Sequence, residues 1–290
     1  EPDGVMQFDA APMGVAALTW IADVGALEAL LADAVRFQNQ IEVLDKPVPA
    51  ALTVVCEGKA SSSRDEFGVE FEITPYDQHA IAARIECQQP HQQIALQWFA
   101  HGEVLAFLPM GGPSGNSVAL VWSVRPEHAT RLMNLSHEDF CLELQAASGH
   151  SLGPLALISE RKLWPLQKAL ARQWSGRSVA GAWALAGDAA HNVPPLSGQG
   201  LNMGLADVAE LARVIRERES WRGLGDNKLL RRYERSRKAG MMPMASGGDG
   251  LQWLFGQSSK AMIRLRNWGM NRIDGSDALK QWLARQAMGF

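Results

Sequence analysis

The chain has 290 residues, of which 47% are hydrophobic and 20% are charged, as in an ordinary globular protein with a sizeable core. Its net charge of −3 gives no indication of nucleic-acid binding, and its three widely spaced cysteines, without a CxxC pair, argue against a zinc ribbon or a disulfide framework. No run of about 18 apolar residues and no signal-peptide pattern occurs, so we expect a cytoplasmic protein without a membrane span.

The first half of the chain shows one helix and then a series of strands. Apolar residues at helical spacing predict a helix over 24–37. The segment ALTVVCEG at 51–58 is typical of a buried strand that ends in a turn. Between 69 and 124, alternating segments with short connections predict an antiparallel sheet of five strands: VEFEI, HAIAARIEC, QIALQWFA, EVLAFLPM and SVALVWSV.

Helices dominate the second half of the chain. Pro126 suits a first helical turn, so a helix is expected after Arg125, with an apolar side formed by Met133, Phe140 and Leu144. The segment WALA predicts a short buried strand within this half. Residues 226–290 are typical of helices, with breaks expected at three segments: 240–243, 247–250 and 274–277.

The segment GDAAHNVPPLSGQGLNMGLADV, residues 187–208, combines a strand end, a Gly/Pro loop and a helix start. Asp188 follows the strand, where a carboxylate can accept hydrogen bonds from sugar-like hydroxyls, and Gly187 leaves room for a ligand. Free N–H groups at the start of the helix form an anion site. The residues around that site are Gly198, Gly200, Leu201 and Asn202.

The helix over 199–217 has a predicted apolar stripe. Its members are Leu201, Leu205, Val208, Ala212 and Ile215. Asp207, Glu210 and Arg213 are expected elsewhere on the helix. His191, just upstream, shows no orienting partner in the sequence, so we interpret it as structural rather than as a base or a metal ligand.

Residues 187–208 resemble the second FAD-binding motif of the para-hydroxybenzoate-hydroxylase-like flavoproteins, which runs GD, a few residues, P and then GxGxN. The resemblance implies that Asp188 holds the ribityl chain of FAD and that Pro195 lies beside the isoalloxazine. It also implies that backbone groups hold the pyrimidine edge, where a reduced flavin carries negative charge. Those groups belong to Gly198, Gly200, Leu201 and Asn202.

Residues 51–71 resemble the middle motif of the same family, in which a strand ends in Asp-Gly. Here the pair is Glu57-Gly58, which the resemblance implies to contact the flavin and nicotinamide phosphates; an ordinary turn is the alternative. Further segments resemble the ubiquinone-biosynthesis branch: YDQHAIAARI, WPL, YERSRKAG and LKQWLARQAMG. The N-terminal GxGxxG segment that binds the ADP half of FAD in this family is not found.

The resemblance therefore implies a mixed α/β (α+β) fold. An incomplete, Rossmann-like FAD-binding domain is expected to carry an inserted antiparallel β-sheet substrate domain and C-terminal helices. The expected parts are 1–68 (partial FAD-binding domain, with the edge of the substrate domain), 69–175 (β-rich substrate domain), 176–225 (second part of the FAD-binding domain) and 226–290 (C-terminal helical region).

The implied activity is the hydroxylation of an aromatic ring by an FAD-dependent monooxygenase. The family uses O2 through a flavin C4a-hydroperoxide, with NAD(P)H as the reductant, and the implied substrate is a polyprenylated phenol of ubiquinone biosynthesis. The cofactor carries the chemistry, so we expect no side-chain nucleophile and no metal. Trp98 and Phe107 on the predicted strands are candidates for lining an aromatic-substrate pocket, with core packing as the alternative.

Two other functions stay open at this point. The chain could be a non-catalytic assembly or scaffold member of a ubiquinone-synthesis complex that binds FAD weakly or not at all. It could also perform a different flavin chemistry, as a halogenase or a prenyl reductase. Basic residues in the C-terminal third indicate solvated helix faces or, alternatively, a patch for acidic lipids or a protein partner at the inner face of the membrane: Arg235, Arg237, Lys238, Lys260, Arg264 and Arg266.

Overall fold

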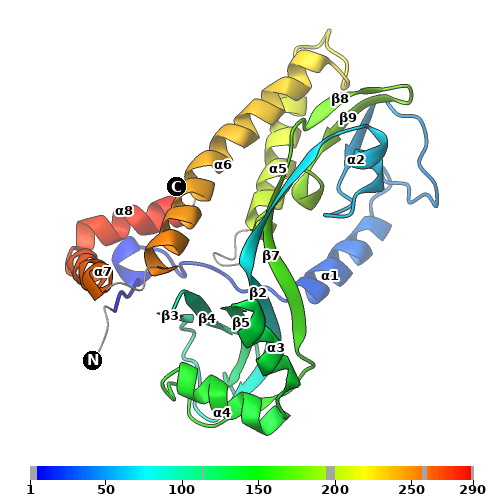
Figure 1. The fold of residues 1–290 in the computed structure, drawn as a ribbon. Coiled ribbons are helices and arrows are strands. Elements are labelled where there is room, and N and C mark those ends of the chain that lie inside the picture. The colour runs from blue at the N-terminus through cyan, green and yellow to red at the C-terminus, as the bar shows by residue number, and fades with distance from the viewer. Residues whose placement is uncertain (1–4, 113, 194–199, 257–259, 289–290) are drawn as a thin grey trace.

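The structure is a computed structural model that describes residues 5–288 except 113, 194–199 and 257–259 (Figure 1). For most residues between 242 and 267, and for 286–288, only the backbone is described. The N-terminal part contains the short 3-10 helix η1 (Ala11–Met13) and the helix α1 (Val24–Arg36). Asp23 caps α1 by accepting a hydrogen bond from the Ala26 backbone N–H (3.3 Å), and the helix predicted over 24–37 is confirmed.

A small sheet consists of β1 (Leu52–Val55), β9 (Gly181–Leu185) and β8 (Ser175–Ser178), in that order. β1 runs parallel to β9, whereas β8 is antiparallel to it. The predicted strands at 51–58 and 183–186 are therefore neighbours in space. All of β9 after Gly181 is buried, which explains why its sequence is continuously apolar rather than alternating.

The large sheet is antiparallel, with the order β10-β7-β2-β5-β4-β3 and with β6 paired to β2. Its strands are β2 (Phe71–Cys87), β3 (Leu96–Ala100), β4 (Glu103–Pro109), β5 (Ser117–Val124), β6 (Leu155–Leu157), β7 (Lys162–Ala171) and β10 (His191–Asn192). The predicted antiparallel sheet is confirmed. The segments VEFEI and HAIAARIEC nevertheless belong to one strand, β2, because the chain only shifts its register on β7 between Pro75 and His79 and does not turn back.

Two helices, α3 (Pro126–Asn134) and α4 (His137–Ala147), cover one face of the large sheet (Figure 1). The sequence predicted a single helix here, which is wrong. Leu135 leaves the helical conformation (φ −68°, ψ 153°), and Ser136 starts α4 by accepting a hydrogen bond from the Asp139 backbone N–H (3.0 Å). The core between helices and sheet contains Ile81, Ile85, Phe107, Leu120, Leu132, Phe140 and Leu144.

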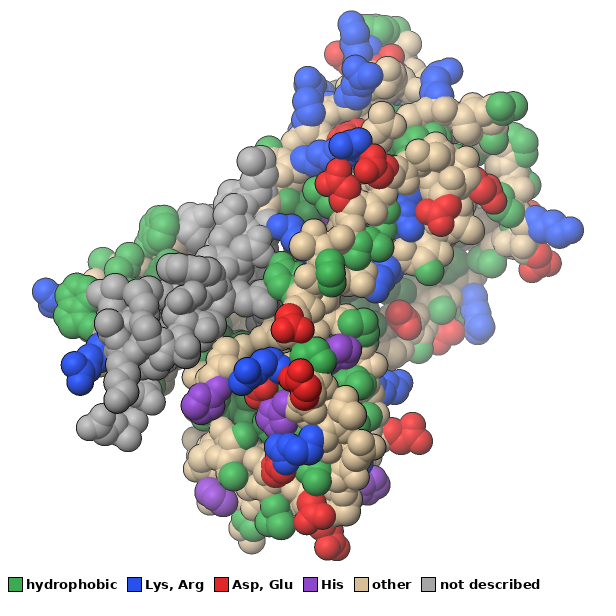
Figure 2. Space-filling view, in the orientation of Figure 1, with side chains coloured by type: hydrophobic (Ala, Val, Ile, Leu, Met, Phe, Trp, Pro, Cys, Tyr) green, Lys and Arg blue, Asp and Glu red, His purple; other side chains and the backbone are tan. Residues whose placement is uncertain are grey.

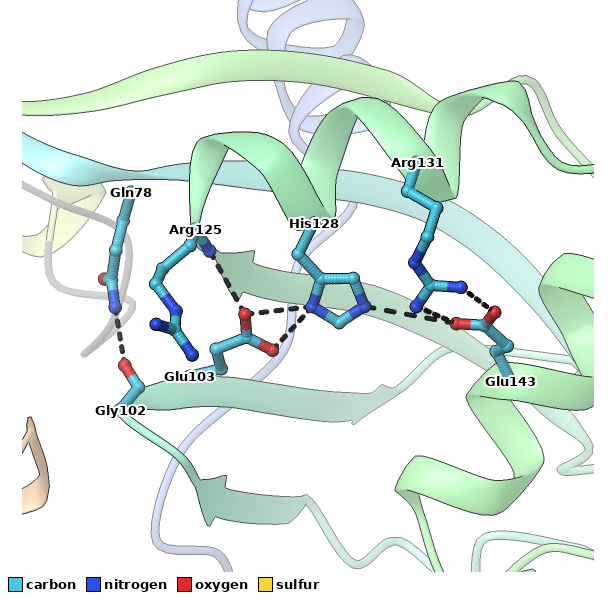
Figure 3. A network of polar contacts seen from close by, with 7 residues as sticks. All are labelled: Gln78, Gly102, Glu103, Arg125, His128, Arg131 and Glu143. Carbon is cyan, nitrogen blue, oxygen red and sulfur yellow. Dashed lines mark hydrogen bonds and ion pairs between the residues drawn. The ribbon is translucent and has the colours of Figure 1, made fainter. Parts of the chain in front are cut away.

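Glu103, at the start of β4, attaches α3 to the sheet (Figure 3). Its carboxylate accepts hydrogen bonds from the Arg125 backbone N–H (3.2 Å) and from Nδ1 of His128 (2.8 Å). Arg131 of α3 then pairs with Glu143 of α4, with Nη2 and Oε2 2.7 Å apart. These polar contacts fix the two helices to the strand edge beside the apolar core.

The second half of the chain continues with α5 (Gly200–Arg216), α6 (Asn227–Gly256), α7 (Lys260–Asp274) and α8 (Asp277–Met288). The break predicted at 274–277 is confirmed. The breaks predicted at 240–243 and 247–250 are wrong, because α6 continues through both; helix propensity is a weak signal that its surroundings override. In the part of the chain that the structure describes, no helix is long and apolar enough to span a membrane.

The expected mixed α/β fold, with a large antiparallel sheet and C-terminal helices, is confirmed. The two sheets have separate hydrophobic cores, one around β9, α5 and α6 and the other between the large sheet and α3–α4. The boundaries expected at 68, 175 and 225 stay predictions.

Candidate functional site

The strands β1 and β9 end side by side at one edge of the small sheet. Val55 pairs with Leu185 in parallel register, and the Ala186 backbone N–H donates to the Val55 carbonyl (3.0 Å). The segments that follow carry Glu57 and Asp188. In α/β sheets, the carboxyl ends of parallel strands are where ligands bind. The structure thus places the two segments that carry these carboxylates, far apart in the sequence, after neighbouring strand ends.

Asp188 lies in a short 3-10 turn, η2 (Gly187–Ala189), directly after β9. Gly187 has φ +61°, a left-handed conformation that L side chains rarely adopt, so the sharp turn requires glycine here. The Asp188 carboxylate is exposed, and within the described residues it accepts a long hydrogen bond from Asn192 Nδ2 (3.4 Å). Its oxygens are therefore available to accept hydrogen bonds from a ligand.

The Asp188 turn packs against the first turns of α5. A Cβ placed on Gly204 would lie 3.6 Å from the Gly187 Cα, so the two backbones approach closely. Among the described residues, a Cβ on Gly200 would meet no atom within 4 Å, and Leu201 is exposed beside it. The first backbone N–H groups of a helix have no intrahelical acceptor and carry its positive dipole end.

Asn202 is also exposed in this first turn of α5. Two further predicted residues, Pro195 and Gly198, lie outside the described residues. Gly187, Asp188, Gly200, Leu201 and Asn202 thus lie on two adjoining elements, and the roles implied for them stay predictions.

Asp207 of α5 holds the turn to the helix. Its side chain is 0% exposed and accepts hydrogen bonds from the Gly187 backbone N–H (2.8 Å), His191 Nε2 (2.6 Å) and Arg237 Nε of α6 (2.6 Å). Burial by itself would raise the pKa of the Asp207 carboxyl, but the hydrogen bond and charge of His191, with Arg237 and the Gly187 amide, hold that pKa below its usual value. Trp174 stacks on the His191 ring, with the centroids 5.0 Å apart.

This network, comprising Asp207, His191, Arg237 and the Gly187 amide, was missed by sequence reasoning. The helix was expected to bury Leu201, Leu205 and Val208, and this is wrong: they are 43%, 53% and 57% exposed. The buried positions are Met203, Asp207, Leu211 and Val214. Both faces of α5 carry apolar residues at helical spacing, so the sequence pattern does not indicate which face is buried.

His191 was interpreted as structural because no partner was evident. It is buried, and its partner is Asp207, sixteen residues further along the chain. Arg237 was assigned to a solvated basic surface but is half-buried against Asp207. The sequence contains an aspartate, Asp207, and two possible cationic partners in separate segments. Nothing in the sequence indicates that these side chains contact one another.

Glu57 and Gly58 form a turn that caps α2 (Ser62–Glu66). Gly58 has φ +80°, and both carboxylate oxygens of Glu57 accept hydrogen bonds: Oε2 from Ser61 Oγ (2.8 Å) and the Ser63 backbone N–H (3.0 Å), and Oε1 from Ser63 Oγ. The hydrogen bonds from Ser63 lower the pKa of Glu57. The geometry of Glu57 and Gly58 agrees with a turn that caps α2. The contact of this pair with the flavin and nicotinamide phosphates stays a prediction.

Arg64, in the Ser-rich stretch after Glu57, links the two motifs. It is 4% exposed, donates from Nη1 to the Ala189 carbonyl (3.3 Å) and stacks over Phe71 (3.8 Å to the ring centroid). Ala189 belongs to the turn that carries Asp188. The chain after β1 is therefore attached to the chain after β9 by a buried side chain that we had not selected as a site residue.

The two substrate candidates lie within or beside the core of the large sheet. Phe107 is 0% exposed and packs in the core under α3 and α4, as the core-packing alternative expects. Trp98 contacts Phe107 edge-on, with the ring centroids 5.1 Å apart, and packs against the same cluster. A role of either side chain in lining a substrate pocket stays a prediction.

Known proteins with similar sequences include ubiquinone hydroxylases. Ubiquinone hydroxylase UbiL from Rhodospirillum rubrum is 32% identical over 243 residues, which are 83% of this chain and 55% of that protein. The 3-demethoxyubiquinol 3-hydroxylase of Escherichia coli is 27% identical over 243 residues, 83% of this chain and 60% of that protein. The chain thus spans a little over half the length of these relatives.

Solved structures share the fold at low identity. The p-nitrophenol 4-monooxygenase PnpA of Pseudomonas putida matches with a TM-score of 0.60 and 16% identity, covering 81% of this chain and 58% of that one. The anhydrotetracycline hydroxylase OxyS of Streptomyces rimosus matches with a TM-score of 0.55 and 20% identity, covering 81% and 45%. The resemblance to the ubiquinone-biosynthesis branch is confirmed by the relatives above. Residues 23–246 match the FAD binding domain family, so the chain belongs to that family.

Proposed function

We propose that this protein is an FAD-dependent monooxygenase that hydroxylates the aromatic ring of a polyprenylated phenol in ubiquinone biosynthesis. One observation carries the proposal: an exposed carboxylate, Asp188, lies on a glycine turn that a buried network holds against the start of α5. The names of the relatives, ubiquinone hydroxylase and 3-demethoxyubiquinol 3-hydroxylase, support the substrate class.

The residues at this strand edge fit FAD. The Asp188 carboxylate suits the hydroxyls of a ribityl chain, because a carboxylate only accepts hydrogen bonds. The open space at Gly200 allows a flat ring to approach the backbone, and the first N–H groups of α5 suit the negative edge of a reduced flavin. Backbone groups of Gly200, Leu201 and Asn202 would hold that edge, and Pro195 and Gly198, which precede them in the sequence, are proposed to contribute to the same site.

The protein contributes binding and orientation, and we propose no side-chain nucleophile. Asp207 acts as a positioning residue: by holding the Gly187 amide, it fixes the direction in which Asp188 points. The chemistry that we propose bound FAD to supply is oxygen activation, after reduction by NAD(P)H and through the flavin C4a-hydroperoxide. Glu57 and Gly58, at the neighbouring strand end, are the residues proposed to meet the phosphates of FAD and NAD(P)H.

A polyprenylated phenol partitions into the hydrocarbon part of a bilayer. We therefore propose that the protein works at the inner face of the membrane, as a peripheral protein or within a multiprotein complex. Its small-molecule partners would be the prenylated phenol and O2.

The test is product analysis with labelled oxygen. The full-length protein is incubated with FAD, NAD(P)H, 18O2 and a polyprenylated phenol, and the product is examined by mass spectrometry. We expect a ring-hydroxylated product that contains one 18O atom. NAD(P)H oxidation without labelled product would contradict the hydroxylase proposal, and halogenated or reduced product would favour a different flavin chemistry. A colourless protein that takes up no FAD would favour the scaffold function.

A further inference from the structure

The C-terminal helices α7 and α8 carry a concentration of positive charge. Residues 260–290 contain six basic and two acidic residues, a net charge of +4, in a chain whose net charge is −3. One of the two acidic residues, Asp274, is paired with Lys280 Nζ (3.1 Å) and accepts a hydrogen bond from the Gln7 backbone N–H (3.0 Å). Among the described residues, no ion pair is formed by Arg264, Arg272 or Arg285.

The same helices expose large apolar side chains between these arginines. On α7, Arg264, Trp268 and Arg272 follow one another at intervals of four residues, so they share one face, and Trp268 is 63% exposed. On α8, Trp282 is 57% exposed, with Leu279 and Arg285 one turn to either side. Ala284, which points elsewhere, is buried, so α8 has an inner and an outer face.

Figure 2 shows apolar side chains, with a few basic ones among them, at the end of the molecule that carries α7 and α8, on the left of the view. We define the C-terminal patch as the exposed residues Arg264, Trp268, Arg272, Leu279, Trp282 and Arg285. Exposed apolar side chains grouped beside basic ones are typical of a surface that binds a membrane or another partner.

From this arrangement we propose that the C-terminal patch docks the protein on an anionic lipid bilayer. Tryptophan favours the boundary between hydrocarbon and headgroups, and arginine one turn away reaches the headgroup phosphates. The positive charge of the patch adds an electrostatic attraction to the negatively charged headgroups. This docking proposal rests on the proposed function, because docking would bring the site at Asp188 and the start of α5 close to a lipid-soluble substrate.

The test is the binding of the protein to vesicles. Pure phosphatidylcholine vesicles are compared with vesicles that contain about 30% phosphatidylglycerol, and bound protein is measured by co-sedimentation; each basic residue near an anionic surface adds a measurable increment of affinity. We expect binding to the anionic vesicles, weak binding to the neutral ones and release at high salt. Brominated lipids should quench tryptophan fluorescence only when the patch is intact.

Two variants test the location. Trp268→Ala/Trp282→Ala removes the indoles, and Arg264→Glu/Arg272→Glu reverses the charge; each should lower the vesicle partition coefficient at least about tenfold. The matched controls are Trp20→Ala/Trp221→Ala, which removes two indoles that are 82% and 71% exposed elsewhere, and Arg231→Glu/Arg235→Glu on α6. Both controls should bind as the unchanged protein does.

Three results would overturn the proposal: no binding to either kind of vesicle, equal losses in the variants and their controls, or a concentration-dependent dimer that the indole variant abolishes without any vesicle effect. The last result would assign the patch to a second copy of the chain. FAD uptake is measured on the same samples. Vesicle binding without FAD uptake would contradict the proposed function alone, and FAD uptake without vesicle binding would contradict the docking proposal alone.

Discussion

Replacing Asp207 by Asn tests how the Asp188 turn is held. The substitution keeps the shape of the side chain but removes its charge and one of its acceptors. Asp207 is 0% exposed and receives three donors, from Gly187, His191 and Arg237. In the variant, the amide NH2 group meets a donor rather than an acceptor, and the positive charge of Arg237 loses its counter-ion.

The magnitude follows from the burial of the pair. Removing one member of a buried ion pair costs about 3–5 kcal/mol, because the other charge is left uncompensated. The Arg237 side chain is 14% exposed and can turn toward water, which favours the lower end, about 3 kcal/mol. The free energy of unfolding is measured by urea denaturation, followed by circular dichroism.

Asp188→Asn is the matched control, because it makes the same change on an exposed carboxylate that accepts a long hydrogen bond, 3.4 Å, from Asn192. We expect that control to change the free energy of unfolding by less than about 0.5 kcal/mol. If Asp207→Asn lost no more than the control, Asp207 would not hold the turn, and the network would be incidental.

Three further predictions concern stability. Asp207 has a lowered pKa, so its contribution is complete above its ordinary value of 3.8 and is lost as the pH falls through the lower folded-state pKa; acid titration of unfolding should show less acid-induced loss in Asp207→Asn. Gly225→Ala should cost about 1–3 kcal/mol, because a Cβ there would lie 2.6 Å from the Ala51 carbonyl oxygen, whereas Gly223→Ala meets no atom within 4 Å and should be nearly neutral; equal melting temperatures would refute this. Glu103→Gln should cost about 1–3 kcal/mol by weakening the attachment of α3, and a chemical denaturation midpoint unchanged from the parent protein would refute that role.

Local patterns in the sequence predicted most strands and the long helix after the Gly/Pro loop. The segment WALA is apolar throughout because its strand is buried, and β3, β4 and β5 alternate because one face packs under α3 and α4. The strand at 51–58 was predicted to be buried, which is wrong: Val55 is buried, but Val54 is 41% exposed. The motif at 187–208 also predicted that Asp188 follows a strand and precedes a helix, which is confirmed because this order is local; its role stays a prediction. The sequence patterns therefore identified the elements that position the site.

What the patterns did not reveal depends on contacts between distant segments. The buried face of α5 is set by Asp207, whose partners His191 and Arg237 come from other elements, so periodicity selected the opposite face. Similarly, the attachment of Arg64 to the Ala189 carbonyl joins residues 125 positions apart. Helix and strand patterns report what is buried in one element, not which polar groups meet across the fold.

The most direct measurement compares the affinity for FAD of the protein with that of its Asp188→Ala variant. Binding is monitored by the quenching of flavin fluorescence. Because Asp188 is exposed and contributes little to stability, the fold should be retained while FAD binding weakens by about 1–3 kcal/mol, the usual value of a hydrogen bond to a charged group. Equal affinities in the two proteins, with circular dichroism showing both folded, would contradict the placement of the flavin at the Asp188 turn and the start of α5.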